Sequence, residues 1–369
     1  MIFISIQLNS DMRFKALKLT LLVLLAGTAM QAQDSSKKDF KLAGIPIINY
    51  NRTQGIQIGA MGAAYFKVNK EDTISPSSSA GLAGLYTSEK SYMLFGFSQL
   101  YLAKDKWRIR AAAGTLDINF QFYYDVPVIA VGDFVDYTTK ANVLAFQLQR
   151  NIFRRVYAGI LGNYVSATTT FKFPSELGGD SSTTSTLNNI GYIFTNDTRD
   201  NVNYPVRGMF LNFKNQFYRD WVGSDYDYTQ FIIGYNQFFV LQKNEKHVIV
   251  ARANVDIATG NVPFEGQSVV GMDDIRGYSQ GEYRGNQIYT LQAEYRWNFY
   301  KRFGMVGFFG LASAVDNFND IFSSQVLPGV GAGFRFRMIR SEKVNIGIDG
   351  AVGRNDYSIT FRIGEAFAR

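Results

Sequence analysis

Hydrophobic and polar residues alternate along most of this chain, in segments of about ten residues that end at Gly, Asn, Asp, Ser or Lys. In the segment 329–339, Val330, Phe334 and Phe336 fall on one face, and Gly331 and Arg335 fall on the other. A side-chain period of two is typical of a β-strand with two different surroundings. The same pattern recurs in the segments 286–299, 343–352 and 357–367. The chain is therefore expected to be all-β.

The polarity of the two faces predicts how these strands close. Charged residues recur on one face, and aromatic and branched residues cover the other. A soluble sandwich rarely sustains exposed aromatic residues over so many long strands. A transmembrane barrel does so, because its apolar face meets lipid and its polar face lines the lumen. We expect an antiparallel transmembrane β-barrel of about 16 strands, at 42–49, 56–67, 79–88, 91–103, 106–123, 137–150, 154–168, 185–196, 207–218, 226–242, 246–258, 286–299, 304–315, 329–340, 343–352 and 357–367.

The lengths of the connections predict the orientation. The turns at 103–106, 242–246, 300–303 and 340–343 are short. The connections at 125–137, 174–184, 220–227 and 260–285 are longer. Bacterial barrels have short periplasmic turns and longer extracellular loops. The first group is therefore assigned to the periplasmic side.

The N-terminal region predicts export. Arg13, Lys15 and Lys18 precede an apolar run from 19 to 30, which is followed by small residues ending at Ala32. This order is typical of a cleaved signal peptide, and the run is too short for a membrane-spanning helix. We expect a signal peptide at 1–32, with Met12 an alternative start, a short periplasmic segment at 33–39 and the barrel at 40–369.

Composition argues against several other classes of protein. The chain has no Cys and one His, so thiol catalysis and Cys-ligated metals are excluded. A Ser-His-Asp site would depend on His247 alone, in a predicted periplasmic turn. The net charge of +7 comes from scattered residues, which does not favour nucleic-acid binding. We expect no enzyme activity, no cofactor and no metal.

Three motifs carry a resemblance to a known family. The long loop before residue 286 contains Arg276, Gly277 and Tyr278 and is followed by the strand 292–296, Gln-Ala-Glu-Tyr-Arg. The predicted turn between the eighth and ninth strands contains Asp197, Thr198, Arg199, Asp200 and Asn201. The chain ends on alternating residues that include Phe361, Ile363 and Phe367. In these motifs the chain resembles bacterial surface antigens, the outer-membrane barrels of the BamA and TamA type.

The resemblance implies a role for each motif. In that family the Arg-Gly-Tyr or Arg-Gly-Phe loop folds back into the lumen, and its arginine docks on inward acids. The alternation places Glu294 and Asp349 inward, so we expect Arg276 to pair with one or both. Many relatives carry an Asp where this chain has Gly310, which increases the expected weight of Asp349. Phe361, Ile363 and Phe367 are expected to form a C-terminal assembly signal, although Ala368 and Arg369 follow.

The turn at 197–201 has two possible roles. In a purely structural role, its side-chain oxygens cap backbone amides and Arg199 pairs with an acid. In the alternative, the turn binds a ligand, and we favour the structural role.

The expected function follows from the resemblance, and it has rivals. Relatives that assemble or translocate proteins carry periplasmic polypeptide-transport-associated domains, and this chain is expected to lack them. Our first hypothesis is a barrel that assists insertion or translocation of proteins, or lipids, at the outer membrane of a Gram-negative bacterium. The alternative is a passive or selective pore, with Arg252, Arg296, Arg335, Arg337 and Arg362 favouring anions. A surface-adhesion role comes third. Expected partners are outer-membrane lipid and lipopolysaccharide, the barrel-assembly machinery and a possible periplasmic protein.

Overall fold

The computed structural model describes residues 40–126, 131–173, 179–271, 274–279 and 281–367. The predicted signal peptide and periplasmic segment lie outside these residues. The strands are β1 Phe40–Asn51, β2 Gly55–Phe66, β3 Ser78–Thr87, β4 Tyr92–Leu102, β5 Trp107–Val126, β6 Val131–Phe153, β7 Val156–Phe171, β8 Ser181–Thr186, β9 Asn189–Asp197, β10 Gly208–Tyr218, β11 Tyr228–Val240, β12 His247–Gly260, β13 Ser268–Val269, β14 Arg284–Gly285, β15 Gln287–Tyr300, β16 Phe303–Val315, β17 Leu327–Ile339, β18 Val344–Val352 and β19 Tyr357–Ile363. Three short 3-10 helices are η3 Asp220–Val222, η4 Phe264–Gly266 and η5 Phe318–Phe322.

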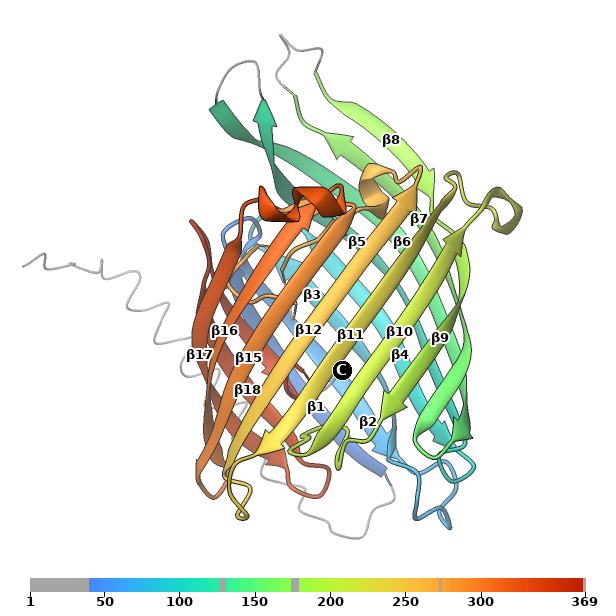
Figure 1. Ribbon diagram of the computed structural model, residues 1–369, viewed down its shortest axis with the longest axis vertical. Coiled ribbons are helices and arrows are strands. Elements are labelled where there is room, and N and C mark those ends of the chain that lie inside the picture. The colour runs from blue at the N-terminus through green and yellow to red at the C-terminus, as the bar shows by residue number, and fades with distance from the viewer. Residues whose placement is uncertain (1–39, 127–130, 174–178, 272–273, 280, 368–369) are drawn as a thin grey trace, which may run out of the picture. The chain divides into compact units, whose positions relative to one another are not determined.

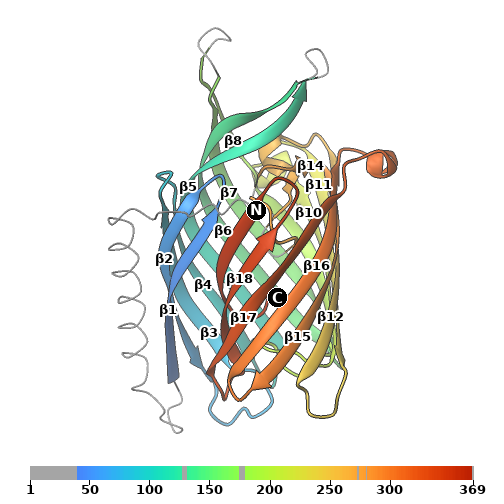
Figure 2. The same ribbon diagram turned by 90° about the vertical axis from the view of Figure 1, so that its left-hand side faces the viewer.

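The long strands form one closed antiparallel barrel (Figure 1, Figure 2). Its sheet contains 17 strands because one barrel-spanning segment is divided into β8 and β9, which both pair with β7. The barrel therefore has 16 spanning strands, which confirms the predicted fold and strand number. Among the described residues, no helix is long and apolar enough to cross a membrane.

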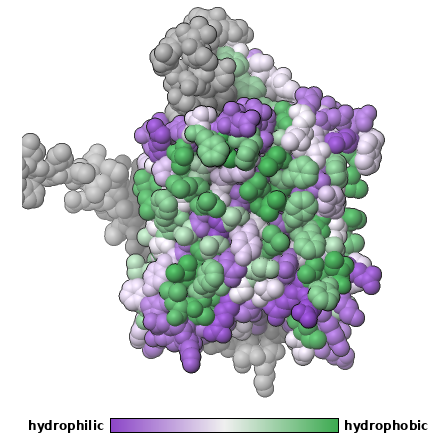
Figure 3. Space-filling model, viewed as in Figure 1, coloured by the Kyte–Doolittle hydropathy of each residue, from purple (hydrophilic) through white to green (hydrophobic). Residues whose placement is uncertain are grey.

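The outer surface carries an apolar belt. Figure 3 shows hydrophobic side chains over the middle of the wall and hydrophilic ones at both ends. Leu291, Tyr295 and Phe309 are examples of large exposed residues in this belt, and the inward Thr290, Glu294 and Arg296 are buried. Alternate side chains of each strand therefore face the lipid and the lumen.

Some predicted boundaries were wrong. The strands β5 and β6 stay paired as far as Val126 and Val131, so the predicted loop at 125–137 is mostly a hairpin. The β7–β8 pairing likewise extends into the predicted loop at 174–184, and both hairpins rise above the rim in Figure 1. The last strand ends at Ile363 and not at 367, because Gly364 adopts a left-handed φ of 79° that turns the chain away from the sheet.

The closure of the barrel is the shortest ladder that the structure describes in the wall. The strands β11 and β12 share 13 residue pairs, from Tyr228↔Gly260 to Val240↔Val248. The strands β1 and β19 share two, Tyr50↔Ile359 and Asn51↔Ser358. We call this β1–β19 contact the seam. Side-chain contacts add to these pairs: the Phe361 amide donates to Asn49 Oδ1 at 2.6 Å, and the rings of Tyr50 and Tyr357 stack.

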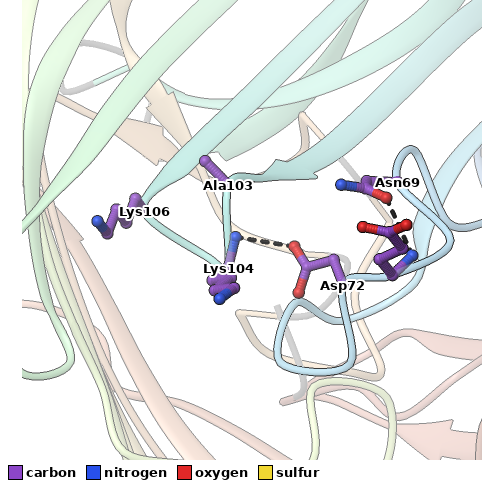
Figure 4. A pocket seen from close by; sticks show the side chains of 6 residues that line it. Asn69, Asp72, Ala103, Lys104 and Lys106 are labelled. Carbon is purple, nitrogen blue, oxygen red and sulfur yellow. Dashed lines mark hydrogen bonds between the residues drawn. The ribbon is translucent and has the colours of Figure 1, made fainter.

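Seven turns connect the strands at the end where β19 finishes, at 67–77, 103–106, 154–155, 198–207, 241–246, 301–302 and 340–343. Most of them are short, and the longest connection, 261–286, lies at the other end. We call the first the periplasmic end and the second the extracellular end. Two of the periplasmic turns are joined by Asp72, which accepts hydrogen bonds from the Ser75 hydroxyl at 2.6 Å and from the Lys104 amide at 2.8 Å. These hydrogen bonds hold the pKa of the Asp72 carboxyl well below its usual range. A hollow of about 430 Å³ lies beside them, lined by Lys104 and Lys106 among others (Figure 4).

Candidate functional site: an inward loop docked on a buried ion network

The connection between β12 and β15, residues 261–286, folds into the barrel, and we call it the inward loop. Its core is apolar: Val270 and Ile275 are fully buried and pack with Ile288, Ala312 and Leu327 from the barrel wall. Its ends are tied by the two-residue ladder between β13 and β14. Apolar burial therefore fixes the loop, and its charged residues are positioned by that packing.

Arg276 lies at the tip of the inward loop and contacts two acids of the wall. Its Nη2 lies 2.7 Å from Glu294 Oε2 on β15, and its Nη1 lies 3.1 Å from Asp349 Oδ2 on β18. The structure thus brings together all three residues that the sequence suggested. The side chains are 2% exposed or less. Groups this deeply buried lose the hydration of their charges, so each of the three charges is stabilised by its oppositely charged partners.

The two acids also bind other arginines of the wall. Arg296 Nε lies 2.8 Å from Glu294 Oε1, and Arg362 Nε lies 2.8 Å from Asp349 Oδ2. Arg335 pairs with Asp349 and, through its Nε at 2.9 Å, with Glu365. Four guanidinium groups therefore share three carboxylates. We call these seven residues the ion network, formed by Arg276, Glu294, Arg296, Arg335, Asp349, Arg362 and Glu365.

An aromatic ring completes the surroundings of Arg276. The guanidinium carbon lies 3.4 Å from the centre of the Phe308 ring, which is in the range of a close cation–π contact. Sequence analysis missed Phe308 as a partner, although the alternation of β16 places it opposite the outward Phe309. Position 310, where the resemblance implies an Asp, is occupied by Gly310. The side chain of Gln292 lies against Gly310 and donates to the Asp274 carbonyl of the inward loop.

Gly277 and Tyr278 attach the inward loop to the β18–β19 turn. Gly277 has a φ of 106°, and a Cβ there would lie 2.7 Å from the carbonyl carbon of Val352. The Tyr278 hydroxyl donates to the Pro328 carbonyl at 2.7 Å and accepts from the Arg354 amide at 2.9 Å. The glycine therefore permits close contact of two backbones, and the tyrosine fixes it.

A second contact of the same turn involves two buried acids. Asp356 accepts hydrogen bonds from the backbone amides of Ser279 and Tyr357. Glu282, which is 3% exposed, lies beside it. Burial first, and then the charge of Asp356 and a hydrogen bond with it, raise the pKa of Glu282 to about 7. The protonated form of Glu282 is therefore favoured up to a higher pH than that of an exposed Glu.

The turn between β9 and β10 has the structural roles expected of its motif. Asp197 pairs with Arg199 at 2.7 Å and with Arg108 at 3.0 Å. The Asp200 carboxylate accepts from the amides of Val206 and Arg207, and Asn201 accepts from those of Asn203 and Tyr204. This turn is placed inside the periplasmic end, where its apolar residues are buried.

The C-terminal residues lie in the lumen, which the sequence did not indicate. Phe361 and Ile363 belong to β19, but Phe367 is fully buried beside Tyr204, Val206, Phe238, Val248, Val250 and Ala366. Its carbonyl accepts from Asn236 Nδ2 at 3.0 Å. The Phe367 ring also faces Arg276, with the guanidinium carbon 5.2 Å from the ring centre. The predicted linear signal is therefore divided between the wall and the interior.

No group of three or more His, Asp or Glu is placed to hold a metal ion in the part of the chain that the structure describes. The fold and the site define a class of protein: a 16-stranded transmembrane barrel with an inward loop whose arginine is docked on wall carboxylates. The model of the Omp85 superfamily domain matches residues 77–367. The chain belongs to the Omp85 superfamily.

Individual relatives are distant. The outer membrane protein assembly factor BamA of Nitratidesulfovibrio vulgaris is 26% identical over 163 residues, which are 39% of this chain and 20% of that protein. The matched segment thus spans a fifth of the relative's length. BamA from Haemophilus ducreyi lacking POTRA domains 1–3 has a TM-score of 0.59 at 14% identity, covering 89% of this chain and 70% of that one. CdiB from Acinetobacter baumannii has a TM-score of 0.58 at 12% identity, covering 89% of this chain and 60% of that one. These two structures share the fold.

Proposed function

We propose that this protein resides in the outer membrane of a Gram-negative bacterium and assists the insertion or translocation of other proteins there. The seam carries this proposal. Two residue pairs join β1 and β19, whereas the other ladders that the structure describes in the wall have six pairs, for β7 and β8, or more, as in the 13 pairs of β11 and β12. Strand edges without a full ladder expose amides and carbonyls that another strand can bind by β-augmentation. The name of the relative BamA, an assembly factor, agrees with this role.

The inward loop supports the seam from inside. It contacts the β18–β19 turn through Gly277 and Tyr278, and that turn contacts the residue after β1 through the hydrogen bond from Arg52 Nη1 to the Asn355 carbonyl at 3.2 Å. The docking of Arg276 therefore positions the last two strands relative to the first. We infer that lipids of the surrounding membrane, the barrel-assembly machinery and a periplasmic protein are partners, and that the chain is not an enzyme.

A pore selective for anions has less support. Of the inward arginines expected to attract anions, Arg296, Arg335 and Arg362 pair with carboxylates of the ion network. Arg252 pairs with Asp274 of the inward loop, and Arg337 donates to Asn345. The charges of four of these five arginines therefore face a carboxylate, which reduces the field that could select anions, whereas the Asn345 partner of Arg337 is neutral.

The test is an insertion assay in which an engineered disulfide can hold the seam closed. Tyr50 and Ile359 are directly opposite each other, and the chain contains no other thiol, so Tyr50→Cys with Ile359→Cys gives a single disulfide across the seam. We expect liposomes with the reduced protein to accelerate the folding of a urea-unfolded small barrel over empty liposomes. Oxidation should abolish the acceleration and reductant should restore it.

The possible outcomes distinguish whether the protein assists insertion from whether the seam is the site of insertion. Acceleration by the reduced protein that persists in full after oxidation would show that the seam is not the route. No acceleration by the unmodified protein would contradict the proposed function. Single Tyr50→Cys and Ile359→Cys variants, which cannot form the disulfide, are the matched controls for oxidation.

A further inference from the structure

The two ends of the barrel differ in charge. Each of the seven periplasmic turns carries two Lys or Arg residues, and together these turns contain six Asp or Glu. In the described residues of the extracellular connections, the balance is reversed, with 11 Asp or Glu and 7 Lys or Arg. Each turn has two cations whatever its length: the two-residue turn 154–155 is Arg-Arg, and the ten-residue turn 198–207 also has two. Six of the seven periplasmic turns therefore carry a net positive charge, and the turn 67–77 is neutral because Glu71 and Asp72 balance its two Lys residues.

Several of these cations lie over aromatic rings of the outer wall. The distance from the cationic atom to the ring centre is 5.4 Å for Arg150 over Trp107, 5.2 Å for Arg154 over Phe153 and 5.1 Å for Lys301 over Tyr300. The three rings are among the exposed large hydrophobic side chains of the barrel. In a transmembrane barrel, exposed aromatic residues at a strand end lie at the level of the lipid headgroups. The cations are therefore placed beside the membrane and not on the end face alone.

Arg150 shows this placement most directly. It is the exposed continuation of the outward row of β6, in which Leu144 and Phe146 are also exposed. It thus belongs to the lipid-facing surface of a strand, between the apolar residues Leu148 and Ile152. A guanidinium that lies over an aromatic ring at the end of a lipid-facing strand can reach the phosphate level of the inner leaflet with its N–H groups.

We propose that the periplasmic rim is a docking surface for anionic phospholipid headgroups of the inner leaflet. We call it the basic collar, and represent it by Arg150, Arg154, Lys301 and Arg302. Arg302 also lies over a ring of the wall, that of Phe336, at 5.9 Å. A phosphate bound by these groups gains charge-assisted hydrogen bonds, and a net anionic lipid gains more than a zwitterionic one, whose ammonium group opposes the collar. The acidic extracellular end lacks this complementarity.

The position of the cations favours lipid over an acidic protein partner. A periplasmic protein would meet the end face of the barrel, whereas the cations over Trp107, Phe153 and Tyr300 accompany side chains that face lipid. The proposal is independent of the seam, because Arg150, Arg154 and Lys301 lie on β6 or in turns that do not contact β1 or β19.

Lipid selectivity measures the collar directly. The full chain would be reconstituted in vesicles of equal phosphatidylcholine and phosphatidylglycerol, extracted in mild detergent, and the retained lipids counted by native mass spectrometry. We expect phosphatidylglycerol to be enriched over phosphatidylcholine. The double variant Arg150→Gln with Lys301→Gln should reduce this enrichment about fivefold or more, because each cation near a membrane surface contributes to anionic-lipid binding.

A matched variant at the other end tests the location. Lys140→Gln with Lys172→Gln removes the same charge from exposed extracellular positions and should leave the enrichment unchanged. Equal retention of the two lipids by the unmodified chain would overturn the proposal and leave an acidic protein as the partner of the rim. An equal loss in both double variants would also overturn it, because the effect would then follow from net charge alone.

Discussion

The guanidinium carbon of Arg276 lies 3.4 Å from the centre of the Phe308 ring. The flat face of the guanidinium therefore contacts an aromatic ring, and its N–H edges are left to bind acids. Its edges pair with Glu294 and Asp349. A planar guanidinium serves both needs, because its N–H groups point outward and its face is weakly hydrated. A lysine ammonium has the charge but neither property.

Arg276→Ala should therefore destabilise the barrel strongly. Its removal leaves Glu294 and Asp349 each with one fewer cation in a buried site, which typically costs about 3–5 kcal/mol. The measurement is unfolding by urea in detergent micelles, followed by the loss of the heat-modifiable band on gels. Arg276→Lys is the control and should recover part of the loss. If alanine and lysine both unfolded as the unmodified protein does, Arg276 would not hold the inward loop.

Gly277→Ala tests the docking without changing any charge. The residue has a φ of 106°, and its Cβ would lie 2.7 Å from the Val352 carbonyl carbon and 2.8 Å from the Gly353 amide. We expect the inward loop to be displaced and to become susceptible to protease. Gly179→Ala is a matched control, because Gly179 also has a positive φ, of 72°, but an added Cβ there meets open space. Equal protease resistance of the two variants would argue against close docking.

The Glu282 and Asp356 pair predicts a dependence on pH. The pKa of Glu282 is raised from its ordinary 4.5 to about 7, so the folded barrel favours the protonated acid. The stabilisation is complete below pH of about 4.5 and is lost as the pH rises through about 7. Melting temperature should fall over this window and level off above it. Glu282→Gln, which keeps a neutral donor, should show a flatter profile; an unchanged profile would assign the dependence to another group.

Phe367→Ala should open a cavity at the periplasmic end. The ring is fully buried among Tyr204, Val206, Phe238 and their neighbours, and such Phe→Ala changes typically cost about 3–5 kcal/mol. Phe322→Ala, at a position that is 91% exposed, is the control and should change stability little. Comparable melting temperatures for both variants would mean that the C-terminal residues do not pack inside the barrel.

Alternating polarity predicted the wall, and together with the resemblance to surface-antigen barrels it predicted the partners of Arg276. The period of two determines which side chains face inward, and Glu294 and Asp349 are inward acids on nearby strands. The pattern gave no information on residues whose position depends on backbone dihedrals or on long-range packing. Phe367 continues the alternation of β19, yet the positive φ of Gly364 turns it into the lumen. Phe308 is one of many aromatics, and only the path of the inward loop brings a cation above it.

The two residue pairs of the seam both lie at the extracellular tips of β1 and β19. The closure is therefore asymmetric, because its backbone pairing lies at the extracellular end of the two strands. A polypeptide arriving from the periplasm would first meet the part of β19 where Asn49 replaces a backbone acceptor, at the Phe361 amide. Opening in the reverse direction would have to break the paired tips and their Tyr50–Tyr357 stack before anything else. For the proposed function, the position of this short ladder predicts that a polypeptide enters from the periplasmic end of the seam.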